Sequence, residues 1–360
     1  MSRKYVFLVH GIGRHQEGEW SKPWKAAILN ALKKYSPFNS MTDGDLDQQL
    51  AFVPISYDSV FEGFRSKWGG LAEALGNNDI IANPGLRKAF EWVADNETED
   101  NGLTAFFWDN VLDAILWYAF PQARGAAIAK VVEQLAAGAR KMYDENNGVN
   151  TSHVLAHSLG TSVSHDALVS LRYAGHIHGG AFDSKHHKWR SVFMISNTSR
   201  LFRTYTRISD DVPIEEYAPY TSNMKSGTRP SAICMRYANV YHRVDPVSWP
   251  RRFAPADWPF SSYLDIETIR FDQQKEIHNI DHYMANPHVH IPFLRSVLQR
   301  DTFGTAAEVA QSMNEFERDY PNQAANEFAQ LRDLLNGDFD RKLNTRELAE
   351  FLVKTYKELQ

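Results

Sequence analysis

The 360-residue sequence predicts an α/β protein built on a doubly wound, mostly parallel β-sheet. Short apolar runs rich in β-branched and aromatic residues alternate with stretches that have the period of amphipathic helices. Several of these runs end in glycine-rich or polar turns. Sites in parallel sheets lie where the strands end, so these turns are the natural place for functional side chains.

The individual elements follow from the same patterns. We expect buried strands at Tyr5–Val9, Ala51–Tyr57, Ser152–His157, Ser191–Ser196, Ala232–Tyr241 and Thr268–Phe271. We expect helices near Trp20–Lys34, Ala126–Tyr143, Leu159–Arg172 and Pro292–Arg300. Strands that alternate with helices favour parallel pairing, because a parallel connection needs a crossover of about 12 residues or more.

Composition limits the environment and the partners of the chain. A net charge of −5 offers no general attraction for nucleic acid or an anionic membrane. Cys234 is the single cysteine and cannot form an internal disulfide, so a reducing, cytoplasmic location is expected. The first predicted strand begins at Tyr5, which argues against a secretory signal, and no window approaches about 20 uncharged apolar residues.

The most informative motif lies at residues 156–160, which read Ala-His-Ser-Leu-Gly directly after a buried run. A nucleophilic serine on a tight strand-to-helix turn needs small residues two positions away on either side, because bulky ones would collide. Ala156 and Gly160 satisfy this requirement around Ser158, with alanine in place of the usual first glycine. The motif therefore makes Ser158 the candidate nucleophile.

A glycine turn at the start of the chain supplies candidate oxyanion donors. The first predicted strand breaks into residues 10–13, which read His-Gly-Ile-Gly. Glycines after a buried strand let the backbone turn and expose N–H groups to a developing negative charge. We assign one donor to the N–H of Ile12 and the other to the N–H of Leu159. An ordinary glycine turn is the alternative interpretation.

Asp245 is the candidate acid, because it follows the predicted strand Ala232–Tyr241. A carboxylate at the end of a strand can orient an imidazole and stabilise its charge. Pro246 would hold Asp245 in an extended conformation. The alternative is a turn residue without a catalytic role, which Asp-Pro pairs often provide.

The candidate base is a histidine after the last predicted strand. We favour His282, because it leaves room for a loop and precedes the predicted helix Pro292–Arg300. His278 is the second choice, and His10, Gly11 and His157 are expected to support the site. Further along the chain from the nucleophile, His186 and His187 beside Asp183 match no standard zinc spacing, so a solvated loop is expected there.

In these pieces the sequence resembles the α/β-hydrolase superfamily, nearest to lipases and esterases. The matching segments are residues 10–13, 156–161, 245–247 and 282–283, in the Ser, Asp, His order of that family. The resemblance implies a hydrolase domain over residues 1–300, a nucleophilic serine, a histidine general base and an orienting aspartate. It implies no required cofactor.

The segment from about 60 to 150 is too long for a simple crossover and is expected to contain a helical insertion or cap. Within it, residues 106–120 are strongly apolar and aromatic. We expect a helix packed on the sheet; a cap that forms an acyl pocket or touches a lipid interface is the alternative. The polar stretch Ser199–Arg229 is either a specificity loop or an ordinary surface excursion.

The C-terminal extension, residues 301–360, contains a loop at 336–347 that resembles a single EF-hand. Its candidate calcium ligands are Asn336, Asp338, Asp340, Lys342, Asn344 and Glu347, with a backbone carbonyl at the lysine. Arg341 stands where glycine is usual, and no partner hand is evident. We therefore favour a helix-loop-helix in which Asn344 caps the second helix, with Glu347 three residues later.

The sequence thus predicts a serine hydrolase that cleaves a carboxylic ester, with an apolar acyl group as the expected substrate. A thioesterase, an amidase or an acyltransferase would use the same residues. A scaffold without catalysis, which binds a lipid or a partner, is the alternative from another class.

Overall fold

The computed structural model describes residues 2–11, 19–64, 117, 121–173, 176–199, 233–243, 245, 263–270, 278–298 and 304–319. Four predicted features lie outside the described residues: Ile12, most of the aromatic run 106–120, the loop after Ser199, and the EF-hand-like loop 336–347.

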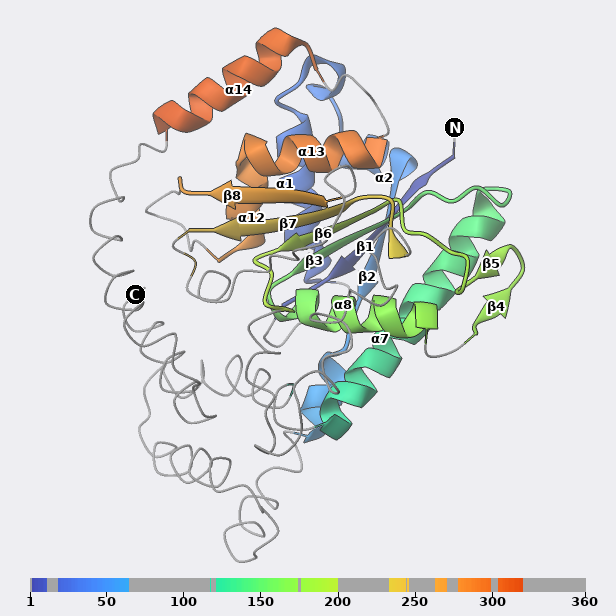
Figure 1. Ribbon diagram of the computed structural model, residues 1–360. Coiled ribbons are helices and arrows are strands. Elements are labelled where there is room, and N and C mark those ends of the chain that lie inside the picture. The colour runs from blue at the N-terminus through green and yellow to red at the C-terminus, as the bar shows by residue number, and fades with distance from the viewer. Residues whose placement is uncertain are drawn as a thin grey trace, which may run out of the picture.

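Six parallel strands form the main sheet. Their spatial order is β2 (Leu50–Ile55), β1 (Lys4–Val9), β3 (Ser152–His157), β6 (Ser191–Ile195), β7 (Tyr237–His242) and β8 (Tyr263–Thr268) (Figure 1). The registers place Val9 opposite Ala156 and His157 opposite Ile195, so the carboxyl ends of the central strands lie level. The predicted α/β class with a mostly parallel sheet is confirmed.

Helices cover both faces of this sheet (Figure 1). One face carries α7 (Pro121–Glu145) and α8 (Leu159–Tyr173), and the other carries α1 (Ser21–Leu32), α12 (Ile280–Ala285) and α13 (Pro287–Leu298). Successive residues of β1 alternate between the two layers: Phe7 packs with α7 and α8, and Leu8 packs with α1 and α13. This alternation is the period of two that a strand buried on both faces must have.

Smaller elements complete the described fold. They are η1 (Ser36–Phe38) and α2 (Asp43–Gln49) between α1 and β2, the antiparallel pair β4 (His178–Gly179) and β5 (Phe182–Asp183), and α14 (Ala306–Asp319) beside α13. Thr42 caps α2 in a capping box with Asp45, which fixes where that helix begins. No helix within the described ranges is both long and apolar enough to cross a membrane.

The strand order creates a switch point between β1 and β3. The chain leaves β1 towards β2 on one side, whereas it leaves β3 towards β6 on the other. The loops after these neighbouring strands therefore diverge, and such a crevice at the carboxyl edge is where parallel sheets bind ligands. The glycine turn and Ser158 follow these two strands.

The last two strands differ from their predicted bounds. The edge strand β8 ends at Thr268 instead of beginning there, because an edge strand alternates polar and apolar residues and lacks a continuous apolar run. β7 begins at Tyr237; upstream of it, Cys234 is buried and forms an isolated bridge with Trp189.

Two helices are longer than predicted. α13 begins at Pro287, where the side chain of Asn286 accepts a hydrogen bond from the His288 N–H at 2.9 Å, and Pro292 lies inside the helix. α7 begins at Pro121 and buries a row of residues about four apart: Ala123, Ala127, Val131, Leu135, Ala139 and Met142. Residues 121–145 thus pack into the core, whereas residues 65–116 of the segment expected to hold a helical insertion or cap lie outside the described residues. Trp117, from the aromatic run, is buried in the same layer.

Candidate active site

Ser158 occupies a sharp turn between β3 and α8. Its φ of 54° lies in the left-handed region, which costs a residue other than glycine roughly 1–2 kcal/mol. The Ser158 N–H donates to the Ile195 carbonyl at 3.0 Å, which ties the turn to the neighbouring strand. This conformation carries the side chain out of the plane of the sheet, as the sequence motif predicts.

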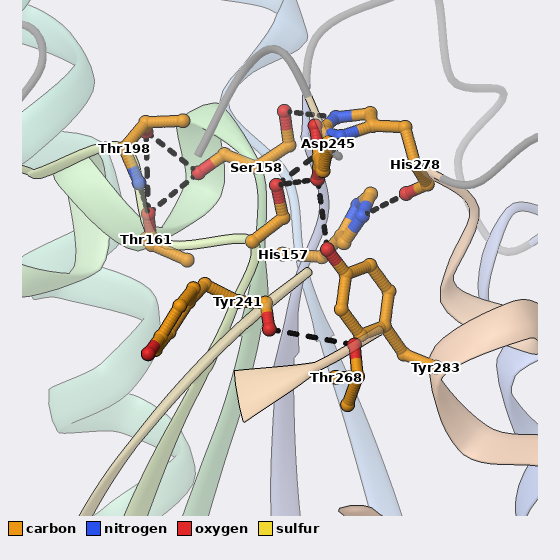
Figure 2. Close-up of polar contacts among 10 residues, drawn as sticks. His157, Ser158, Thr161, Thr198, Tyr241, Asp245, Thr268, His278 and Tyr283 are labelled. Atoms are coloured by element: carbon orange, nitrogen blue, oxygen red, sulfur yellow. Dashed lines mark hydrogen bonds and ion pairs between the residues drawn. The ribbon is translucent and has the colours of Figure 1, made fainter. Parts of the chain in front are cut away.

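A cluster of hydroxyl groups holds the carbonyl of Ser158. The Thr161 hydroxyl donates to this carbonyl at 2.6 Å and the Thr198 hydroxyl donates to it at 2.9 Å (Figure 2). The Thr161 N–H donates to the same oxygen at 2.9 Å. These bonds, all in a buried environment, offset part of the strain of the turn.

Close packing against β1 explains the glycines around Ser158. A Cβ at Gly160 would lie 2.1 Å from the His10 carbonyl oxygen and 2.6 Å from that of Val9. A Cβ at Gly11 would lie 2.7 Å from the Cβ of Ser158. The end of β1 and the serine turn therefore touch, as donors from both turns must if they are to reach one oxyanion.

His278 links Ser158 to Asp245 (Figure 2). Its Nε2 lies 2.8 Å from the Ser158 Oγ, and its Nδ1 lies 2.9 Å from the Asp245 Oδ2. Asp245 is fully buried, whereas His278 keeps 29% of its side chain exposed. Ser158 itself is only 2% exposed, so the more open approach to the pair is from the side of the imidazole.

The structure places His278, and not the expected His282, beside Ser158 and Asp245. His282 lies one helical turn further on, inside α12, and is buried against the ring of His242 at 5.5 Å. His278 precedes α12, where the chain still lies over the carboxyl ends of the strands.

Burial keeps the neighbouring His242 uncharged. The pKa of His242 is lowered to about 4, mainly by desolvation and to a smaller extent by the adjacent His282. His242 is the last residue of β7, and its carbonyl accepts the Asp245 N–H at 3.1 Å. At neutral pH it therefore brings no positive charge that would compete with His278 for the carboxylate.

Three side chains fix the glycine turn. The His10 Nε2 lies 3.1 Å from Asp58 Oδ2, and both groups are buried. The ring of His10 stacks on that of Tyr57, with centroids 4.6 Å apart. The Tyr57 hydroxyl donates to the carbonyls of His10 and Gly11 at 2.8 and 3.0 Å. The backbone of His10 and Gly11 is thus held in place by buried side chains.

His157, the residue before the nucleophile, anchors the loop of the base. Its Nε2 donates to the His278 carbonyl at 2.5 Å, and the two rings lie 4.8 Å apart. Trp24 of α1 packs edge-on against His157, with ring centroids 6.0 Å apart. Because its Nε2–H is engaged with a backbone carbonyl, His157 serves to position His278.

Leu159 is the first residue of α8. The first N–H groups of a helix have no acceptor within the helix, and they carry the positive end of its dipole. The N–H of Leu159 is therefore suitably located to receive an oxyanion beside Ser158.

Sequence reasoning missed two further members of the site, Ser196 and Tyr283. The hydroxyls of Ser196 and Tyr283 donate to Asp245 Oδ2 at 2.6 and 2.8 Å. Ser196 was expected as the last residue of the strand Ser191–Ser196, whereas in the structure it directly follows β6, where a functional side chain can lie. Tyr283 lies on α12, and no local pattern marks it.

A groove of about 680 Å³ runs between α1 and α12. Its walls include the apolar residues Trp20, Trp24, Ala27, Ile280 and Met284. Asn279, which follows His278 directly, lies at its edge.

Among the described residues, no group of three or more His, Cys, Asp or Glu side chains is arranged to hold a metal ion. In the β4–β5 region, His176 and His186 each contact a different oxygen of Asp183, at 3.1 and 2.7 Å. The His186 side chain is 83% exposed, as expected of a solvated loop, but His187 is buried, with its Nε2 3.2 Å from the Ser152 hydroxyl, so that expectation is wrong for His187.

Comparisons with known proteins found no matching family model, no matching curated protein and no matching solved structure.

Proposed function

We propose that this protein is a serine hydrolase of the α/β-hydrolase type that cleaves carboxylic esters. The observation that carries the proposal is the His278 imidazole, with Ser158 Oγ 2.8 Å from one nitrogen and Asp245 Oδ2 2.9 Å from the other. A serine on a left-handed turn, an imidazole and a buried carboxylate joined in this order form the arrangement that activates a hydroxyl for acyl transfer.

Each group has a defined part in the reaction. Ser158 Oγ attacks the ester carbonyl carbon while His278 Nε2 takes the hydroxyl proton. The carbonyl oxygen becomes an oxyanion, which the N–H groups of Leu159 and Ile12 receive. His278 then gives the proton to the leaving alcohol as the bond to carbon breaks, which leaves an acyl group on Ser158.

Water completes the cycle by the same groups. His278 takes a proton from the water as it attacks the acyl carbon, and returns that proton to Ser158 Oγ when the acid leaves. Asp245 remains ionised throughout; it holds the Nδ1–H of His278 and stabilises the imidazolium.

The groove between α1 and α12 supports an apolar acyl group as the substrate. Its lining includes Asn279, the residue after His278, together with indole, alanine and methionine side chains; the polar residues Asn30, Lys34 and Asp281 also lie on its walls. An apolar chain laid along it gains about 0.8 kcal/mol for each methylene removed from water. Ala27→Phe, which partly fills the groove, is expected to reduce the turnover of long-chain esters more than that of acetate.

The test is a panel of p-nitrophenyl esters from acetate to decanoate, with matched thioesters and anilides. We expect Ser158→Ala to lower kcat/KM by a factor of about 10³ or more. Ser164→Ala is the matched control: it lies in the same helix, its hydroxyl is buried, and activity should stay within about twofold.

Three results are informative. Ester hydrolysis that disappears with Ser158→Ala supports the proposal. Preferential turnover of thioesters or anilides by the same serine would change the bond that is cleaved and keep the mechanism. Hydrolysis that survives Ser158→Ala, or a folded protein that turns over none of the panel, would contradict the proposal and favour a binding protein.

A further inference from the structure

Two serines face the two nitrogens of His278. Ser158 Oγ lies 2.8 Å from Nε2, and Ser196 Oγ lies 3.1 Å from Nδ1. Both serines directly follow a parallel strand, and both have a left-handed backbone, with φ of 54° and 51°. Ser196 is fully buried. Backbone strain of this kind persists where the surrounding structure and function require it.

The hydrogen atoms around Nδ1 can be assigned from the distances. The Ser196 hydroxyl donates to Asp245 Oδ2 at 2.6 Å, which is the better use of its proton because the acceptor is a carboxylate. The oxygen of Ser196 is then left as an acceptor toward the Nδ1–H of His278, which also points to Asp245 Oδ2 at 2.9 Å. Nδ1–H is therefore shared between two acceptors.

This arrangement selects one tautomer of His278. With the proton on Nδ1, Nε2 presents a lone pair to the Ser158 hydroxyl, as a general base must. With the proton on Nε2, the Nδ1 lone pair would face the carboxylate oxygen, which is repulsive. Ser196 adds to this preference only while its own hydroxyl donates to Asp245 Oδ2, because only then does its oxygen accept the Nδ1–H of His278.

Tyr283 holds the same carboxylate oxygen from α12. Its hydroxyl donates to Asp245 Oδ2 at 2.8 Å, and neither residue is exposed (Figure 2). The hydroxyls of Ser196 and Tyr283 thus each donate an uncharged hydrogen bond to Asp245 Oδ2. The same oxygen accepts the Nδ1–H of His278. Such donors fix the plane of the carboxylate and disperse its charge.

We propose that Ser196 and Tyr283 are positioning residues that set the tautomer and the basicity of His278. The proposal rests on the function proposed above. Because both hydroxyls withdraw charge from Asp245, they weaken its stabilisation of the imidazolium and keep His278 in its basic form at lower pH. Removing either hydroxyl leaves a more strongly charged carboxylate, which holds the proton on His278 to higher pH.

Ser196→Ala and Ser196→Gly separate the hydroxyl from the backbone. Both remove the hydroxyl, but only glycine relieves the left-handed strain. We expect both variants to lose about 10- to 100-fold in kcat with little change in KM, and Ser196→Gly to melt at a higher temperature than Ser196→Ala. If the activities of the two variants instead rank as their melting temperatures do, with Ser196→Gly close to the wild type, then Ser196 has a purely structural role and the proposal is overturned.

The pH dependence provides the second readout. In Ser196→Gly and Tyr283→Phe, the acid limb of the kcat/KM profile should move to higher pH by about half a unit or more. Tyr143→Phe is the control: it removes a tyrosine hydroxyl that lies 3.1 Å from His187 Nδ1, away from the site, and should leave the acid limb in place. An unmoved acid limb in both site variants would overturn the proposal.

NMR titration of His278 distinguishes a failure of this proposal from a failure of the proposed function. It is performed in a Ser158→Ala background and requires no turnover. A midpoint that rises with Tyr283→Phe supports the positioning network even if no ester is cleaved. A midpoint that does not move refutes the network, whatever the hydrolysis assays show.

Discussion

Gly160→Ala tests the packing that holds the serine turn. The added Cβ would lie 2.1 Å from the His10 carbonyl oxygen, and real Cβ atoms do not approach heavy atoms more closely than about 3.0 Å. The start of α8 must therefore move by about 0.9 Å from β1, since both groups that clash are backbone and no rotamer relieves them. A displacement near 1 Å at a catalytic group costs about 10²-fold in rate, and overpacking of this kind costs about 1–3 kcal/mol in stability.

The assay compares urea unfolding and ester hydrolysis for Gly160→Ala and Gly125→Ala. Gly125 lies in α7 with open space around it, so alanine there should stabilise the protein by about 0.5–1 kcal/mol and leave activity unchanged. Gly160→Ala should lose both stability and rate. A Gly160→Ala protein as stable and as active as the wild type would refute the contact between α8 and the end of β1.

Three further predictions concern the surroundings of the nucleophile. His278→Ala should reduce kcat by about 10⁴-fold. His282→Gln should lower the melting temperature but leave the activity of the folded protein within about tenfold. If His282→Gln instead lost more activity than His278→Ala, His282 would be the base. Tyr57→Phe removes the donor to two carbonyls of the glycine turn and should cost about 1 kcal/mol of stability, together with a measurable loss of kcat. The free energy of unfolding should fall as pH decreases from 6.5 towards 4, since unfolded His242 binds a proton near its ordinary pKa of 6.5 and the buried side chain does so only near a pKa of about 4. His242→Asn should make this fall shallower in urea titrations at pH 7 and pH 5. An unchanged pH dependence would show that His242 takes up a proton as readily in the folded protein as in the unfolded chain.

Local patterns were sufficient for the sheet and for much of the site. The apolar run Val154–Ala156 before Ser158 marked the centre of β3, all six residues of which are buried, as in a strand covered on both faces. The small residues around Ser158 reflect the approach of α8 to β1, a requirement that acts within a few residues and is therefore visible in sequence. Asp245 was found for a similar reason, since it follows its strand closely.

The base and its supports depend on contacts between distant elements. His278 and His282 differ by one helical turn, and only the position of α12 over the sheet decides which ring reaches Ser158. Tyr283 reaches Asp245 across 38 positions of sequence. No pattern within a single element records such a contact, so sequence alone left the choice of histidine open and gave Tyr283 no part beyond its place in the segment 282–283.

The central claim is that Ser158 is an activated nucleophile, and covalent labelling tests it most directly. The folded protein is incubated with a fluorophosphonate, and intact mass and peptide mapping locate the adduct. We predict one adduct, on Ser158, which is absent in Ser158→Ala and forms about 10³-fold more slowly in His278→Ala. Folded protein that takes up no label, or that takes it up on another residue, would contradict the claim.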